Sequence, residues 1–329
     1  MPSRVRAAVL LLGVAALIIQ APLMAQATTT AVEGAARHID RERLMRDVET
    51  LAAPAFEGRR AGTPGGLRAR RWLVDQFRAI GLAGGGTQEY LQPFTFSAID
   101  ARTVRSGPGP DPSDSAAANV IGRLSGSNRR ARILVVTAHY DHVGIRDGVL
   151  YPGADDNASG VAVLLAAARH FVANRPRHPM VFAALDAEEL GQRGARALID
   201  STLLARSAVA MNINLDMVSR SDRHEVYAAG TSYSPWLRPL LQDVQTRAPV
   251  KILFGHDRPP DRGGLEDWTE SSDHRVFHAA GIPFVYFGVD DHPDYHKPTD
   301  TAGRIDSRFF GDAADMIIEA LRTFDARVD

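Results

Sequence analysis

Four short runs of aliphatic and β-branched residues constrain the fold of this 329-residue chain more than any other feature. They predict strands that are buried on both faces, as in a parallel sheet covered by helices. The runs span residues 133–137, 180–185, 208–215 and 282–289. Apolar segments that can form helices lie between them. The sequence therefore predicts an α/β fold, a single three-layer domain with a mostly parallel central sheet.

Weaker patterns predict the remaining elements. Two more strands are expected over residues 88–96 and 119–124. Helices are expected over residues 40–51, 63–81, 158–173, 234–246, 272–281 and 307–324. Thr63, Pro64 and Gly81 supply a cap, a first-turn proline and a C-terminal glycine for the second of these helices. The polar segment 55–60 that precedes it is expected to be a loop with solvated charges.

Residues that can bind metal or move protons follow every one of the four buried runs. They are His139 and Asp141, Glu188 and Glu189, Asp216, and His296 with its acidic neighbours. In open α/β sheets, ligands bind at the edge where the carboxyl ends of the strands meet. Asp156 reaches the same edge from the segment that begins the helix of residues 158–173. We therefore expect one metal site at the carboxyl ends of the strands.

Each of these signals also has a plainer interpretation. A single His-x-Asp is usually a hydrogen-bonded surface pair, and two adjacent acids more often mark a helix start, where the dipole favours negative charge. Repetition at four strand ends favours a common site instead. Two histidines with several carboxylates and no thiolate fit two zinc ions that share a carboxylate. Magnesium would be expected to use fewer histidines and more oxygen ligands.

The first 27 residues are interpreted as a secretory signal peptide. Arg4 and Arg6 precede an apolar core over residues 7–19, and Ala25-Gln-Ala27 resembles a cleavage site. An uncleaved membrane anchor is the alternative. Cleavage predicts a secreted or periplasmic protein, free of the membrane, whose folded domain covers residues 28–329.

Charge and cysteine content exclude some classes of protein. Loss of the first 27 residues removes two arginines and no acid, which changes the formal charge from −1 to −3. A strongly basic nucleic-acid surface is therefore not expected. The chain has no cysteine, so an exported domain must depend on core burial or bound metal rather than disulfides. The oligomeric state cannot be inferred from the sequence.

Six motifs occur in order between residues 139 and 296. They are His139-Tyr-Asp141, Gly153-Ala-Asp-Asp156-Asn-Ala-Ser-Gly160, Ala187-Glu188-Glu189-x-Gly191, Leu215-Asp216-Met217, Ser272-Asp273-His274 and Tyr295-His296. In this order and spacing they resemble the zinc-dependent exopeptidases of the bacterial leucyl aminopeptidase type. Glutamate carboxypeptidase, glutaminyl cyclase and the transferrin receptor ectodomain are relatives of that family. The resemblance implies a di-zinc peptidase domain over residues 28–329.

The resemblance also implies five metal ligands. Asp156 would bridge two zinc ions. His139 and Asp216 would bind one ion, and Glu189 and His296 would bind the other. Since these five complete a di-zinc site, the other histidines near the motifs are not expected to be ligands. Those are His142, His256, His274, His278 and His292.

Three further residues have catalytic roles by the same resemblance. Glu188 would be the general base that takes a proton from a zinc-activated bridging water and passes it to the leaving amine. Asp141 would orient His139, and Tyr295 would donate a hydrogen bond to the developing oxyanion. A cis peptide bond between Asp156 and Asn157 is also implied.

The expected function is an exported metallo-aminopeptidase that acts on peptides with a free amino terminus. The loop over residues 254–270 is expected to form a rim over the site, with Phe254, Leu265 and Trp268 favouring large apolar first residues. A carboxypeptidase of the same clan would be a second function, for which Arg220 or Arg262 could bind the substrate carboxylate.

Glutaminyl cyclisation and non-catalytic binding also stay open as functions. A glutaminyl cyclase would use one zinc and typically has Trp before the last histidine, where this chain has Tyr295. A non-catalytic binding ectodomain would be expected to have lost ligands, and all five are present.

Overall fold

The structure, a computed structural model, describes residues 37–95, 116–258 and 266–329. The predicted signal peptide, residues 1–27, lies outside the described residues, and the boundary after it stays a prediction. Arg262 and Leu265 also lie outside them. In the described part of the chain, no helix combines the length and the apolar character that a bilayer span requires.

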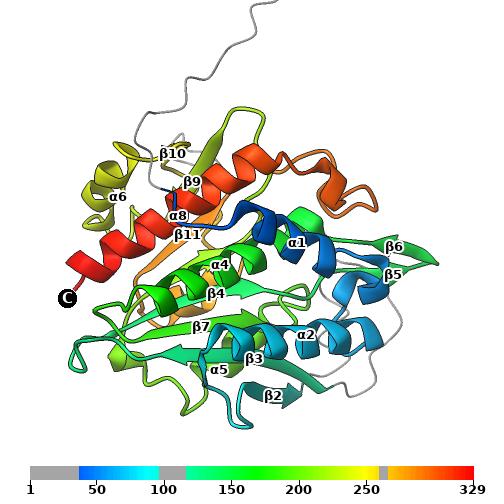
Figure 1. The fold of residues 1–329 in the computed structure, drawn as a ribbon, viewed down its shortest axis with the longest axis horizontal. Helices are drawn as coiled ribbons and strands as arrows, with labels where there is room; N and C mark the ends of the chain where they lie inside the picture. The colour runs from blue at the N-terminus through cyan, green and yellow to red at the C-terminus, as the bar shows by residue number, and fades with distance from the viewer. Residues whose placement is uncertain (1–36, 96–115, 259–265) are drawn as a thin grey trace, which may run out of the picture. The chain divides into compact units, whose positions relative to one another are not determined.

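A mixed sheet of nine strands forms the centre of the described residues (Figure 1). Its order is β1-β3-β7-β4-β8-β11-β9-β10, with β2 paired to β3. The strands are β1 (Ala83–Gly84), β2 (Leu91–Thr95), β3 (Ala116–Leu124), β4 (Ile133–His139), β7 (Met180–Leu185), β8 (Val209–Leu215), β9 (Glu225–Ala229), β10 (Lys251–Leu253) and β11 (Phe284–Gly288).

The four buried runs form the parallel centre of this sheet, as predicted. β7, β4, β8 and β11 are adjacent and parallel, so their carboxyl ends meet at one edge. The sheet is mixed because β3 pairs antiparallel with β7, and β9 pairs antiparallel with β11. The predicted α/β fold is confirmed.

Helices cover both faces of the sheet and give the predicted three layers (Figure 1). On one face lie α1 (Arg41–Leu51), α2 (Pro64–Ile80), α4 (Gly160–Ala173), α6 (Leu237–Gln245) and α8 (Ser307–Arg327). On the other lie α5 (Arg193–Ile199) and α7 (His274–Ala279). The main apolar core fills the space between the sheet and the first set. A smaller core packs against α5 and α7.

Local signals in the sequence explain where the first helices begin and end. The Asp40 side chain accepts a hydrogen bond from the Arg43 amide and caps α1. Thr63 caps α2 in the same way, and Gly81 ends it with a φ of 94°. α4 is rich in small apolar residues and almost wholly buried, since it lies between the sheet and the outer helices.

Several short elements were not predicted. β5 (Gly144–Arg146) and β6 (Val149–Tyr151) form a separate hairpin, and β1, β9 and β10 extend the sheet. Strands of two to five residues are too short to show a clear period. The helix expected from residue 158 begins at Gly160, because a wide turn over Ala154–Ser159 precedes it.

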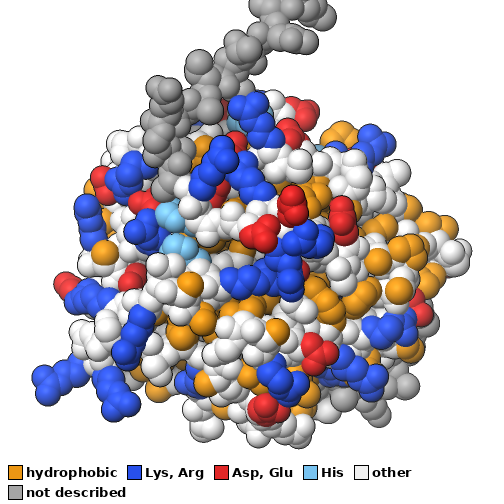
Figure 2. Space-filling model, in the orientation of Figure 1, with side chains coloured by type: hydrophobic (Ala, Val, Ile, Leu, Met, Phe, Trp, Pro, Cys, Tyr) orange, Lys and Arg blue, Asp and Glu red, His pale blue; other side chains and the backbone are white. Residues whose placement is uncertain are grey.

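Basic side chains are prominent on the face that Figure 2 shows. Among the described residues, several arginines of the helices are paired with acids. Arg41 contacts Asp312 and Asp315, the latter at 2.8 Å. Arg169 contacts Asp47 at 2.7 Å. The positive charge of these two arginines is therefore neutralised locally.

Candidate metal centre

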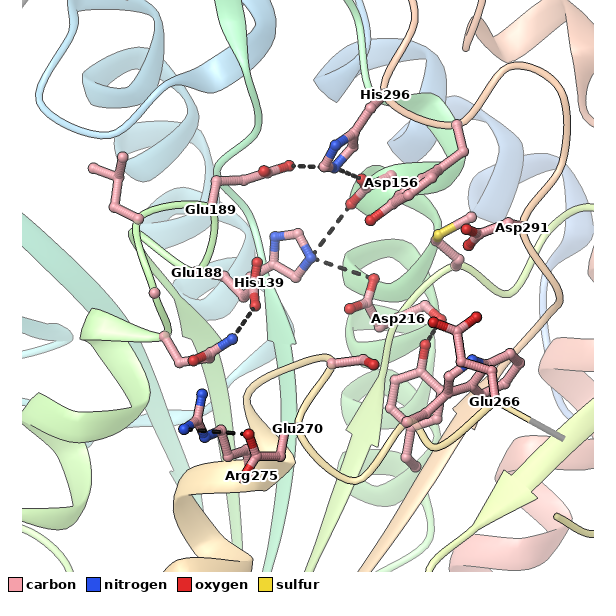
Figure 3. A pocket seen from close by; sticks show the side chains of 18 of the residues that line it. His139, Asp156, Glu188, Glu189, Asp216, Glu266, Glu270, Arg275, Asp291 and His296 are labelled. Atoms are coloured by element: carbon pink, nitrogen blue, oxygen red, sulfur yellow. Dashed lines mark hydrogen bonds and ion pairs between the residues drawn. The ribbon is translucent and has the colours of Figure 1, made fainter. Parts of the chain in front are cut away.

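The predicted ligands gather at the edge where the parallel strands end (Figure 3). His139 is the last residue of β4, and Asp216 directly follows β8. Glu189 lies in the turn after β7, His296 lies in the segment after β11, and Asp156 lies in the turn before α4. The expected convergence of these five residues on one site is therefore present.

Asp156 lies between two groups of donor atoms. Its Oδ1 is 3.4 Å from His139 Nε2, which is also 3.3 Å from Asp216 Oδ1. Its Oδ2 is 2.9 Å from His296 Nε2, which is also 3.3 Å from Glu189 Oε1. One carboxylate thus presents a different oxygen to each group, as a bridging carboxylate can.

A histidine that was not expected among the donors also lies in this site. His142 Nδ1 is 2.9 Å from Glu189 Oε1 and 3.6 Å from Asp156 Oδ2. The side chain is fully buried. Its position three residues after His139, in the same strand-end motif, was the signal that could have identified it.

The donor sets fit zinc. We call His139, Asp156 and Asp216 the inner group, and His142, Asp156, Glu189 and His296 the outer group. In each group the donor atoms all lie within 4.8 Å of one another. They are imidazole nitrogens and carboxylate oxygens, which are common zinc ligands.

The electrostatics of the site favour a cation. Burial alone would lower the pKa of His296, but Glu189 and Asp156 raise it to about 11. Burial likewise opposes the charged form of His139, yet Asp216 and Asp141 raise the pKa of His139 well above its ordinary value. The carboxylates of both groups therefore stabilise a positive charge between them, and a metal cation can supply that charge.

Asp141 contacts both His139 and the Glu188–Glu189 turn. Its carbonyl oxygen is 3.1 Å from His139 Nδ1, while its carboxylate is 3.7 Å from that nitrogen. The carboxylate accepts hydrogen bonds from the backbone amides of Glu188 and Glu189, at 3.0 and 3.3 Å. Asp141 thus faces His139 mainly through its backbone and fixes the Glu188–Glu189 turn through its side chain.

Glu188 lines the cavity next to the donor groups (Figure 3). Burial raises its pKa well above the ordinary value, although the nearby His139 opposes the shift. The Gln192 amide donates to Glu188 Oε1 at 3.0 Å. Gln192 was not singled out from the sequence, since a lone glutamine near a helix start carries no distinctive pattern.

The expectation that the charges of segment 55–60 are solvated is wrong for Arg59. Its guanidinium is fully buried and donates to four backbone carbonyls, those of Tyr140, Leu51, Pro152 and Gly153, at 2.6 to 2.8 Å. Burial lowers the pKa of Arg59 to about 10, against the effect of nearby Asp156 and Asp300. It therefore joins the segment that follows His139 to the loop that leads to Asp156.

Hydrogen bonds also fix the backbone around Asp156. The Asp300 carboxylate accepts from the amides of Asp155 and Asp156. The peptide bond between Asp156 and Asn157 is cis, as the family resemblance implied. His292 Nε2 is 3.0 Å from the Asp155 carboxylate, so this histidine supports the loop.

A cavity of about 500 Å³ opens next to the donor groups. Trp268 lines it, as expected for the rim loop, and so does Tyr295, whose ring stacks on His296 with 4.1 Å between centroids. Phe254 lies elsewhere, with Arg238 4.4 Å from its ring centroid, and lines a separate cavity. The expectation that Phe254 shapes this cavity is therefore wrong.

Arg220, which was suggested for a carboxylate pocket, does not line this cavity. Arg220 pairs with Asp294 at 2.7 Å and lines another cavity, and Arg262 lies outside the described residues. Three other arginines do line the cavity, namely Arg193, Arg196 and Arg275. Arg275 lies 3.4 Å from Glu270 (Figure 3).

A three-layer α/β fold with this donor set at the carboxyl edge defines a class of metal-dependent hydrolases. Residues 119–321 match the model of peptidase family M28. The chain belongs to this family.

Two curated relatives support a peptidase. Aminopeptidase YwaD of Bacillus subtilis is 34% identical over 218 residues, which cover 62% of this chain and 44% of the relative. A probable zinc metalloprotease of Pyricularia oryzae is 27% identical over 283 residues, which cover 76% of this chain and 54% of the relative. The chain spans about half the length of these relatives.

Solved structures confirm the fold. An aminopeptidase from Aneurinibacillus sp. strain AM-1 aligns with a TM-score of 0.68 at 19% identity, covering 86% of this chain and 93% of that chain. A glutaminyl cyclase from Porphyromonas gingivalis aligns with a TM-score of 0.66 at 19% identity, covering 87% and 99%.

Proposed function

We propose that this chain is an exported zinc-dependent aminopeptidase that removes N-terminal residues from peptides. The observation that supports this most is the position of Asp156, whose two oxygens face separate donor groups beside the carboxylate of Glu188. The names of two relatives, a zinc metalloprotease and an aminopeptidase, support the same assignment. Two zinc ions per chain are part of the proposal.

His139 and Asp216 would bind one zinc ion, Glu189 and His296 would bind the other, and Asp156 would be shared. Zinc bound there would lower the pKa of a water molecule and polarise the peptide carbonyl. The protein contributes the proton transfers. Glu188 takes a proton from the attacking water as the new C–O bond forms, and returns it to the amine as the C–N bond breaks.

Tyr295 and the acidic residues complete the proposed machinery. Burial raises the pKa of Tyr295, so its hydroxyl stays protonated and can donate to the carbonyl oxygen as negative charge develops there. The free amine of the substrate would be held by acidic groups of the cavity such as Glu188 and Asp216. Trp268, Met217 and Val289 give the cavity an apolar part, which supports a preference for large apolar first residues.

Hydrolysis of defined substrates tests this function. Leucine p-nitroanilide should be cleaved, glutamate p-nitroanilide should be cleaved more slowly, and N-acetyl-leucine p-nitroanilide should resist because its amine is blocked. A chelator should abolish cleavage, and zinc or cobalt should restore it. No cleavage of the free leucine compound by the zinc-loaded protein would contradict the proposal.

A carboxypeptidase is the second candidate, because Arg193, Arg196 and Arg275 line the cavity. Trimming of an N-acetylated peptide from its carboxyl end would favour it. Cyclisation of an N-terminal glutamine would favour instead the reaction named for the Porphyromonas gingivalis structure.

Export is tested separately. The mature protein should be recovered from the periplasm or the medium, with an amino terminus that begins after Ala27. Recovery of the full-length chain with the membranes would favour the uncleaved anchor.

A further inference from the structure

His142 is a buried histidine that contacts a proposed metal ligand but has no assigned role. Its imidazole is fully buried, and its Nδ1 is 2.9 Å from Glu189 Oε1. Its ring lies close to that of His296, with 5.6 Å between centroids. The distance to Glu189 is that of a hydrogen bond. It is also compatible with two donors that share one metal ion, so other contacts must distinguish these two cases.

The other ring nitrogen of His142 distinguishes a hydrogen bond to Glu189 from direct metal binding. No described residue forms a hydrogen bond with His142 Nε2, although that atom is buried. A histidine that binds metal through one nitrogen almost always donates the N–H of the other to an acceptor. Ligation through Nδ1 would place a hydrogen on Nε2 without an acceptor. In the other tautomer the hydrogen is on Nδ1, where Glu189 accepts it, and Nε2 carries no hydrogen.

The backbone next to His142 holds the ring in this place. Gly153 has a φ of 58°, and a Cβ atom added there would lie 2.5 Å from ring atoms of His142. Since only glycine leaves this space, the ring packs directly against the loop that leads to Asp156. The Gly153 carbonyl is also bound by Arg59. The imidazole is thus held between that loop and Glu189.

We infer that His142 is a positioning residue for the outer metal site: its Nδ1–H donates to Glu189 Oε1 and orients that carboxylate toward Asp156 and His296. This rests on the proposed binding of zinc at the outer group. The inner group depends less on His142, because Nδ1 approaches its shared member Asp156 no closer than 3.6 Å. The two metal sites should therefore respond differently to loss of the imidazole.

Two substitutions separate a positioning role from direct ligation. His142→Ala removes the donor. In His142→Asn the amide nitrogen is bonded to Cγ, as Nδ1 is in histidine, so an N–H donor is kept. The imidazole is replaced by an amide, which is a poor zinc ligand. His278→Asn is a matched control, since His278 packs against Tyr233 and Phe284 away from the donor groups.

The measurement is a zinc titration of metal-free protein in competition with a chromophoric chelator, together with the absorption spectrum of the cobalt-loaded protein. His142→Ala should weaken one of two zinc constants by about 10–100-fold, as loss of a residue that orients a ligand typically does. His142→Asn and His278→Asn should keep both constants and the cobalt spectrum close to wild type. Melting curves of the metal-free variants show whether each is folded.

Two results would overturn the inference. If His142→Asn is as weak as His142→Ala and both change the cobalt spectrum, the imidazole is itself a ligand. If folded His142→Ala keeps both constants, the imidazole does not position Glu189. A wild-type chain that binds a single zinc would count against the proposed two-zinc function. The role of His142 is then tested on the single zinc-binding constant. His142→Ala must weaken zinc binding, and His142→Asn must preserve it.

Discussion

The inner and outer groups share Asp156 but are built differently. His139 ends β4, and the Asp216 amide still donates to the Phe287 carbonyl of β11 at 3.1 Å, so the inner group belongs to the sheet. Glu189 and His296 lie on connecting segments after their strands. The His139 side chain is 2% exposed, and that of His296 is 24% exposed.

The two groups are therefore held in position by different means. Residues on strands are placed by the sheet itself, whereas residues on loops need additional contacts to reach the same precision. Glu189 has such contacts: the Asp141 carboxylate accepts a hydrogen bond from its amide, and the His142 imidazole contacts its side chain. We therefore expect the inner site to hold metal more tightly and to exchange it more slowly than the outer site.

The largest effect should come from the residue that both groups share. Asp156→Ala should remove both zinc ions and reduce hydrolysis to background, because neither group keeps its full donor set. Elemental analysis after dialysis measures the loss, and circular dichroism shows whether the fold remains. A folded variant with one tightly bound zinc would mean that Asp156 serves a single site.

Glu188→Gln should abolish turnover without affecting either group. The side chain lies beside the donors but would not be a ligand, so both zinc ions should stay. Loss of a general base typically lowers the rate by about 10²–10⁴-fold, and the effect should be at least this large because Glu188 acts twice. Steady-state kinetics and zinc content are measured together. Loss of zinc would place Glu188 among the ligands.

One substitution in each group tests the contrast directly. Glu189→Gln should lose the outer zinc and keep the inner one, while Asp216→Asn should do the reverse. Because the inner group is part of the sheet, the zinc left in Glu189→Gln should resist a chelator longer than the zinc left in Asp216→Asn. Equal release rates in the two variants would remove the distinction between the groups.

The smallest effect should come from Gln192→Ala. The Gln192 amide donates to Glu188 Oε1, which favours the charged carboxylate and lowers its pKa relative to burial alone. Its removal should raise the pKa of Glu188, so the acid limb of kcat/KM should move to higher pH. Activity should fall several-fold on that limb and stay near wild type at high pH. A limb that moves to lower pH would contradict this role.

The sequence predicts the site residues that lie at or just after the end of a buried strand. Buried runs followed by His139, Glu188 and Asp216 are visible locally, and the sheet topology brings them together. The structure bears out this convergence, whereas the separate roles of the residues stay predictions. The meeting of His139 and Asp216 at one edge could therefore be predicted from the strand pattern alone.

The contacts that hold the site could not be predicted in the same way. Arg59 lies in a short polar segment, and local sequence does not distinguish a guanidinium bound to buried carbonyls from one in water. The place of His142 depends on the path of the loop through Gly153, which packs on its ring. The contacts of Arg59 with Tyr140 and Pro152 join segments far apart in the chain, so no local pattern reports them. The position of His142 in the motif marks it as near the site but does not report its contact with Glu189.

Stepwise removal of zinc would show whether the chain has two metal sites of different strength. The purified protein should contain two zinc ions per chain and, in a graded concentration of chelator, release them in two phases, with leucine p-nitroanilide hydrolysis lost as the first ion leaves. The ion that leaves first should be the one absent from Glu189→Gln. A wild-type chain that holds one zinc at full activity, or releases two in a single phase, would contradict the account.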